Sequence, residues 1–129
     1  MSLTFNTDYH LSIWRPIGVT TKSDIVLLLN DFVKMEKDKP TFNRFSDFAE
    51  ADLNAIKFEE MHQFYMLREM AYKGPIVKNA FYVNTSLQYG LARTYQTLMS
   101  DTPIKVDIFK TREECAIHLN VPLEILLPN

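Results

Sequence analysis

The chain has 129 residues, of which 47% are hydrophobic and 23% charged, and its net charge is −2 with a pI near 5.9. These values predict a single globular domain over residues 1–129 with one core, and exclude a largely disordered chain. The slightly acidic balance argues against a nucleic-acid-binding protein, which normally shows a basic face. No apolar run reaches the roughly 20 residues that a membrane helix needs, so we expect no membrane insertion. The first ten residues lack the basic and apolar regions of a signal peptide.

Residues that carry chemistry are few and scattered. The single cysteine, Cys115, excludes an internal disulfide and favours a reducing cytoplasm. Cys115 and His118 offer only two metal ligands on one predicted helix, and the other two histidines lie on separate elements. The three glycines are isolated, so no phosphate-binding loop is present, and no nucleophile elbow is found. We therefore expect no metal, no cofactor and no enzymatic activity.

The first third of the chain predicts a hairpin followed by a helix. Residues 3–6 and 9–14 form two short runs, and in the second Leu11 and Ile13 alternate with polar residues, as in a half-buried strand. Thr21 and Asp24 then have the spacing of an acidic capping box at a helix start. Apolar residues recur at helical spacing after it. We expect the charged residues 34–39 to be solvated before Pro40 ends the helix.

The middle of the chain predicts a strand and an unusually apolar helix. Residues 43–48 are interpreted as a strand and residues 58–72 as a helix, which ends at Gly74 in a left-handed cap before Pro75. The helix is apolar on more than one face, and a fully buried helix is difficult to accommodate in a chain this short. We therefore expect it to contribute to a homodimer or partner surface, through residues that include Phe64, Met66 and Met70.

The last part of the chain predicts two more strands and two more helices. Residues 80–83 form a short apolar run typical of a strand buried on both faces, and Asn84 or Thr85 caps the next helix. Gly90 on the inner stripe of that helix predicts a close approach to the sheet. Residues 104–109 alternate as a strand near a sheet edge, and residues 111–114 form a second capping box. We expect the following helix and the tail from Val121 to pack against the core.

This order, β-β-α-β-α-β-α-β-α, predicts an α/β fold with a mainly parallel sheet that the early hairpin makes mixed. Three segments, "NRFSDF", "YGLARTYQTL" and "PIKVDIFKTREECAIHL", resemble a group of small bacterial proteins with the SpoIIAA-like, or STAS-like, fold. The resemblance begins near Thr20 and implies a mixed four- to five-stranded sheet with helices mainly on one face. Known relatives are anti-sigma-factor antagonists or regulatory modules, and others resemble lipid-binding CRAL-TRIO domains.

One departure from that resemblance concerns phosphorylation. Antagonists of this type carry a switch serine at the start of the helix after the second core strand. Residues 54–60 of this chain contain neither serine nor threonine. Since phosphorylation needs a hydroxyl to receive the roughly −2 charge, we do not expect a partner switch of the usual kind.

Two polar pairs are candidate site residues. Arg44 and Asp47 lie on the central strand, and one interpretation is a charge pair that ties the strand end to a neighbouring helix. The other interpretation is a groove that they line together with Tyr89 and Arg93, since ligands of open α/β sheets bind beyond the carboxyl ends of strands. Tyr89 and Arg93 are otherwise expected to pair on the helix surface.

The sequence thus leaves two functions open. The first is a non-enzymatic regulatory or protein-interaction module with a protein partner or a second copy. The alternative is a binding protein for a small apolar or anionic ligand, in a pocket under the second or third helix. An exposed apolar helix face over a closed core favours the first, and an enclosed cavity of several hundred Å3 favours the second.

Overall fold

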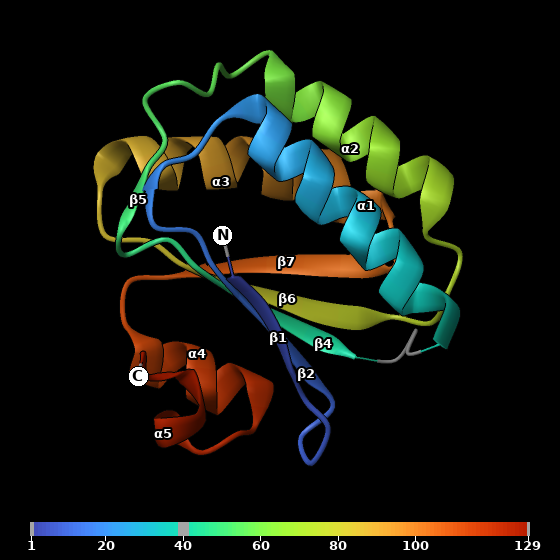
Figure 1. The fold of residues 1–129 in the computed structure, drawn as a ribbon, viewed down its shortest axis with the longest axis vertical. Coiled ribbons are helices and arrows are strands. Elements are labelled where there is room, and N and C mark those ends of the chain that lie inside the picture. Colours follow the sequence, from blue (N-terminus) through green and yellow to red (C-terminus); the bar gives the residue numbers. More distant parts are fainter. Residues whose placement is uncertain (1, 39–41, 129) are drawn as a thin grey trace.

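The computed structural model describes residues 2–38 and 42–128, which form a central mixed sheet with helices on both faces (Figure 1). The five strands of this sheet have the order β1-β2-β4-β6-β7. β1 pairs antiparallel with β2, and every other pairing is parallel. The predicted hairpin and the edge position of the last strand are therefore confirmed. The strands are β1 (Ser2–Asn6), β2 (Leu11–Arg15), β4 (Asn43–Asp47), β6 (Val77–Tyr82) and β7 (Ile104–Phe109).

The three long helices cover one face of the sheet, and two short ones cover the other (Figure 1). α1 (Lys22–Asp38), α2 (Glu60–Ala71) and α3 (Ser86–Leu98) pack over the first face. The far face holds α4 (Arg112–Leu119) and α5 (Leu123–Leu126), so the C-terminal segment packs against the core as predicted. The remaining elements are β3 (Gly18–Val19) and β5 (Ala51–Asp52), which pair in parallel, and the 3-10 helix η1 (Met99–Asp101).

Alternation along the strands divides the interior into two cores. In β4, Arg44 and Ser46 face the long helices, whereas Phe45 and Asp47 face α4. β6 is buried on both faces as predicted, with Phe81 in the larger core and Ala80 in the smaller one. Because the side-chain period of a strand is two, residues three apart necessarily lie on opposite faces.

Both predicted capping boxes are present. The Asp24 N–H donates to Thr21 Oγ1 at 3.3 Å, and the Thr21 N–H donates to Asp24 Oδ2 at 2.8 Å. At the start of α4, the Glu114 N–H donates to Thr111 Oγ1 at 3.1 Å. These bonds satisfy helix N–H groups that have no partner within the helix.

Two predictions about glycines are wrong. α2 ends at Tyr72 in extended backbone, and Gly18 is the one glycine with a positive φ in the described residues, so Gly74 is not a left-handed cap. A Cβ at Gly74 would instead lie 2.8 Å from the Tyr72 ring. Gly90 does not bring α3 onto the sheet, because a Cβ there would meet the Phe58 ring at 3.2 Å. Both glycines make room for an aromatic ring.

Candidate ligand site

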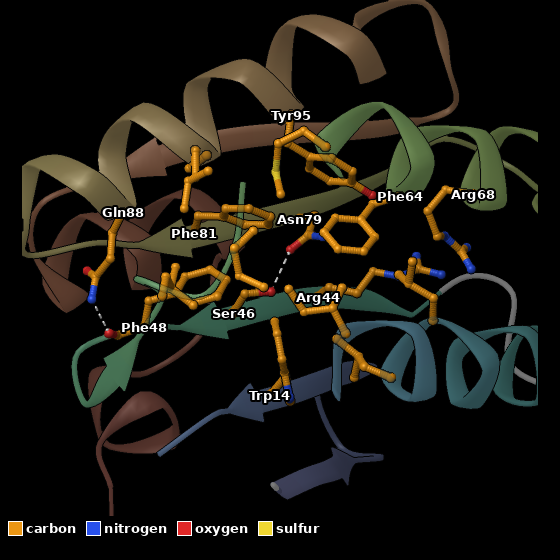
Figure 2. A pocket seen from close by; sticks show the side chains of 18 of the residues that line it. Trp14, Arg44, Ser46, Phe48, Phe64, Arg68, Asn79, Phe81, Gln88 and Tyr95 are labelled. Carbon is orange, nitrogen blue, oxygen red and sulfur yellow. Dashed lines mark hydrogen bonds between the residues drawn. The ribbon is translucent and has the colours of Figure 1, made fainter. Parts of the chain in front are cut away.

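A cavity of about 80 Å3 lies between the sheet and the three long helices (Figure 2). Its lining side chains are buried except Ile25 and Tyr95, which are half-buried, so most of its wall belongs to the protein interior. Apolar groups make up most of the wall. The residues that line it from the strands include Trp14, Ser46, Asn79, Phe81 and Ile104, and those from the helices include Leu28, Phe32, Phe64, Leu91, Ala92 and Tyr95.

Aromatic rings in contact run along one side of the cavity. Trp14 and Phe48 pack edge to face with centroids 5.3 Å apart, and Phe48 meets Phe81 in the same way at 5.3 Å. Phe81 in turn stacks on Tyr95 at 6.0 Å. Burial raises the pKa of Tyr95 to about 12, so its hydroxyl stays neutral at physiological pH. This side of the cavity therefore offers rigid apolar surface.

Gln88, on α3, forms one end of the cavity, and hydrogen bonds occupy its side-chain amide (Figure 2). Its Nε2 donates to the Phe48 carbonyl at 2.7 Å and to the Ala51 carbonyl at 3.1 Å, and its Oε1 accepts from the Asn84 N–H at 2.8 Å. Across the floor, Ser46 Oγ donates to Asn79 Oδ1 at 3.2 Å. The Gln88 amide is therefore not available to a ligand.

The other end of the cavity is charged (Figure 2). Glu36 of α1, Arg44 of β4 and Arg68 of α2 are 8%, 2% and 3% exposed in their side chains. Arg44 Nη2 donates to Glu36 Oε2 at 2.6 Å, and Arg68 Nη2 donates to the same oxygen. Arg44 Nη1 donates to the Phe42 carbonyl at 2.6 Å. We call these three residues the buried arginine cluster.

Two aromatic rings flank the buried arginine cluster. The Arg44 guanidinium lies 5.7 Å from the Phe32 ring and 5.2 Å from the Tyr72 ring, and that of Arg68 lies 5.7 and 5.8 Å from the same rings. Burial lowers the pKa of Arg44, and the charge of Glu36 opposes that shift. Arg68 Nη1, Glu36 Oε1 and Trp14 Nε1 are buried without a hydrogen-bond partner. Arg68 and Trp14 line the cavity.

A second charged cluster lies on the far face of the sheet, at the carboxyl end of β4. Asp47 is 3% exposed and forms ion pairs with Arg15 and with Arg112, whose Nε lies 3.0 Å from Oδ2. Arg15 also donates to the Leu126 carbonyl, and the Arg112 guanidinium lies 4.7 Å from the Tyr82 ring. These bonds attach α4 and α5 to the strand end, in agreement with the charge-pair interpretation. Burial raises the pKa of the neighbouring Cys115 thiol to about 12.

The structure brings together only some of the residues that the sequence singles out. Arg44 and Phe64 both line the cavity, whereas Asp47 lies on the opposite face of the sheet. Tyr89 is exposed beneath Lys110, and Arg93 donates to Gln96 on the surface of α3. The four-residue groove of Arg44, Asp47, Tyr89 and Arg93 is therefore not formed. Met66 and Met70 are exposed on the outer side of α2.

Sequence reasoning missed most of the polar residues around the cavity. Glu36 was expected in a solvated run, which is wrong, because it follows Phe32 by four residues and continues the same inner stripe. Arg68 follows Phe64 by four residues and Met61 by seven, so its place on an apolar stripe signalled burial. Trp14 and Gln88 gave no comparable signal.

No protein-family model matches the chain, and comparisons with curated proteins and with solved structures find no match. In residues 2–38 and 42–128, no group of three or more His, Cys, Asp or Glu side chains is placed to hold a metal ion. None of the helices in the described part of the chain has the length and apolar character to cross a membrane. The cavity and its charged end are therefore the candidate binding site.

Proposed function

We propose that this protein is a non-enzymatic binding module that holds a small, mainly apolar molecule in the cavity under α1, α2 and α3. The observation that carries this proposal is the space of about 80 Å3 with buried, largely apolar walls. Protein interiors are close-packed, and voids larger than one water molecule are few. A cavity needs only about 10–15 Å3 to admit a water molecule, and this cavity is several times larger.

A cavity of this size has an energetic cost that a ligand can offset. At about 24 cal/mol per Å3 of void, 80 Å3 destabilises the folded state by about 2 kcal/mol. The volume falls short of the several hundred Å3 that the sequence led us to expect for a ligand-binding protein, so the proposal requires a much smaller molecule. An engineered cavity of about 150 Å3 admits benzene, so a molecule with about three to five carbon atoms suits this one.

The proposal is tested with a neutral probe of that size, 1-butanol, titrated into the protein while amide shifts are recorded by NMR. We expect saturable shifts in α1, α2, α3 and the strand residues beneath them. The matched control is Ala92→Leu, which places three added carbons in the cavity and should abolish the response. A wild-type protein that shows no saturable shift with 1-butanol or with any probe of comparable size contradicts the proposal.

A second candidate function is a protein-interaction or regulatory module that pairs with a second copy of this chain through α2. Met66, Leu67 and Met70 lie on its outer side and are 41%, 41% and 68% exposed. Apolar side chains clustered on one helix face favour an interface, because their burial removes apolar surface from water. This candidate includes the STAS-like assignment, which the five-stranded mixed sheet supports, and a cytoplasmic location, which the lone buried Cys115 supports.

Sedimentation equilibrium tests the second candidate. We expect the wild-type chain to self-associate with rising concentration and Met70→Glu to remain monomeric, because a charge in the interface would be desolvated. The control is Ile117→Glu, which changes an equally apolar residue, 80% exposed, on the far face. Wild-type protein that stays monomeric at high concentration, or two variants that behave alike, would rule out α2 as the interface.

A further inference from the structure

The buried arginine cluster has an excess of positive charge. It contains two guanidinium groups and one carboxylate, and each side chain is at least nine-tenths buried. Within the described residues, no other carboxylate forms an ion pair with Arg44 or Arg68. The cluster therefore carries a net charge of about +1 out of reach of water, an arrangement that proteins usually avoid because a desolvated charge without a partner is costly.

Neighbouring groups compensate this charge only in part. The faces of Phe32 and Tyr72 attract both guanidinium groups, but a cation–π contact is weaker than a buried ion pair. The Phe42 carbonyl accepts a hydrogen bond from Arg44. Arg68 Nη1 has no hydrogen-bond partner. One donor, Arg68 Nη1, and one acceptor, Glu36 Oε1, thus remain unpaired in the cluster.

The rest of the cavity restricts what can sit against that donor. Phe64 and Tyr95 lie beside Arg68 in Figure 2, and the space beyond them is bounded by Phe48, Phe81 and apolar side chains of α1 and α3. Gln88, at the opposite end, has no free hydrogen-bonding group. A ligand that suits this lining has one anionic group near Arg68 and a mainly apolar body, with the unpaired Trp14 Nε1 as a further donor beside it.

We propose that the ligand is a short-chain monocarboxylate of about three to five carbons, with its carboxylate on Arg68 and its alkyl chain toward Phe48 and Phe81. This inference rests on the proposed function, because it assumes that the cavity is the binding site. A single carboxylate supplies the one negative charge that the cluster lacks. A larger anion would exceed the volume of the cavity, and a doubly charged anion would exceed the single positive charge of the cluster.

Butyrate, butyramide and 1-butanol form a matched set of probes for this inference, since butyramide has almost the shape of butyrate without its charge. We expect butyrate to bind wild-type protein with a Kd at least tenfold lower than that of butyramide, measured by NMR titration at pH 7. Neutral probes that bind at least as tightly as butyrate overturn the inference and leave the proposed function standing. If none of the three binds, both fall.

The Arg68→Met variant tests whether the preference for butyrate over butyramide comes from the Arg68 guanidinium. It leaves Glu36 and Arg44 as a one-to-one pair and replaces the guanidinium with an apolar side chain of similar length, so we expect the fold to persist. Its Kd for butyrate should rise to that of butyramide, whose own Kd should stay within about twofold of wild type. The control Arg93→Met makes the same charge change on the outer surface of α3 and should keep the preference. An unchanged preference in Arg68→Met overturns the inference.

If Arg68→Met does not fold, the wild-type comparison of butyrate with butyramide still decides the inference.

Discussion

The two faces of the sheet each carry one carboxylate between two arginines, but the two clusters differ in their access to water. Arg15 and Arg112, around Asp47, keep 18% and 22% of their side chains exposed, whereas Arg44 and Arg68, around Glu36, keep 2% and 3%. The same ratio of charges therefore has different consequences. On the far face water solvates the surplus positive charge, whereas on the cavity face the proposed ligand carboxylate would neutralise it.

The two clusters also differ in what surrounds them: one borders solvent and the other borders the cavity. Asp47 and its arginines attach α4 and α5, and their remaining donors reach the Leu126 carbonyl or solvent. The buried arginine cluster joins α1, β4 and α2 but also borders a cavity and keeps an unpaired donor. Burial, more than the number of charges, distinguishes an ion-pair network that holds elements together from one that can also bind a ligand.

The largest effect is expected when the carboxylate of each cluster is removed. Glu36→Gln leaves two buried arginines without a counter-charge and should lower the free energy of unfolding by about 3–5 kcal/mol. Asp47→Asn should lower it by only about 1–2 kcal/mol, because Arg15 and Arg112 can turn toward water. Urea denaturation of both variants measures the difference. Equal losses would show that exposure does not distinguish the clusters.

A second effect, specific to the far face, should appear at alkaline pH. Burial raises the pKa of Cys115 from 9.0 to about 12, so the folded state keeps its proton where the unfolded chain loses it. The contribution of the Cys115 thiol to the free energy of unfolding is fully present below pH 9 and is lost as pH rises toward 12. The rise in pKa from 9.0 to about 12 sets an upper limit of about 4 kcal/mol on this loss.

Denaturant titrations of wild type and Cys115→Ala between pH 8 and 11 check this effect. The wild-type protein should lose more stability over that range than the variant, because alanine at position 115 has no proton to lose. Parallel pH profiles for the two proteins would contradict the proposed origin of the effect.

A smaller effect is expected when a leucine is introduced into each core. Ala92 lines the cavity and is 5% exposed, so Ala92→Leu should fill space and raise stability by about 1 kcal/mol. Cys115 lies on α4 with no exposed surface, so Cys115→Leu should overpack the far core and cost about 1–3 kcal/mol. Thermal unfolding compares the two. A destabilised Ala92→Leu would mean that the cavity cannot hold added carbons.

Local signals explain how much of this fold the sequence could predict. The alternation of Leu11 and Ile13 predicted a strand, although β2 is buried on both faces and not half-buried as expected. The spacing of Thr21 and Asp24 predicted a helix start, since it depends on neighbours in the chain. The resulting order of elements was sufficient for a five-stranded mixed sheet. The presence of helices on both faces depends on where the chain turns after β7, which no local pattern encodes.

The candidate site was harder to predict, although part of its signal was present. Arg44 and Asp47 are three apart on one strand, so the period of two already separates them onto opposite faces. Glu36 and Arg68 continue apolar helical stripes, but Glu36 was expected in solvent and Arg68 was not singled out as a site residue. The cavity itself could not be inferred, because 80 Å3 is a small difference between large packed volumes set by every side chain together.

The contact between Arg15 and the Leu126 carbonyl joins a strand near the start of the chain to a helix synthesised more than a hundred residues later. Until α4 and α5 leave the ribosome, Leu11, Ile13, Phe45 and Ala80 have nothing to cover them, whereas the opposite face can already be assembled. A nascent chain that pauses after β7 would therefore expose one apolar face of the sheet to chaperones and to aggregation, until the synthesis of α4 and α5 allows that face to be covered.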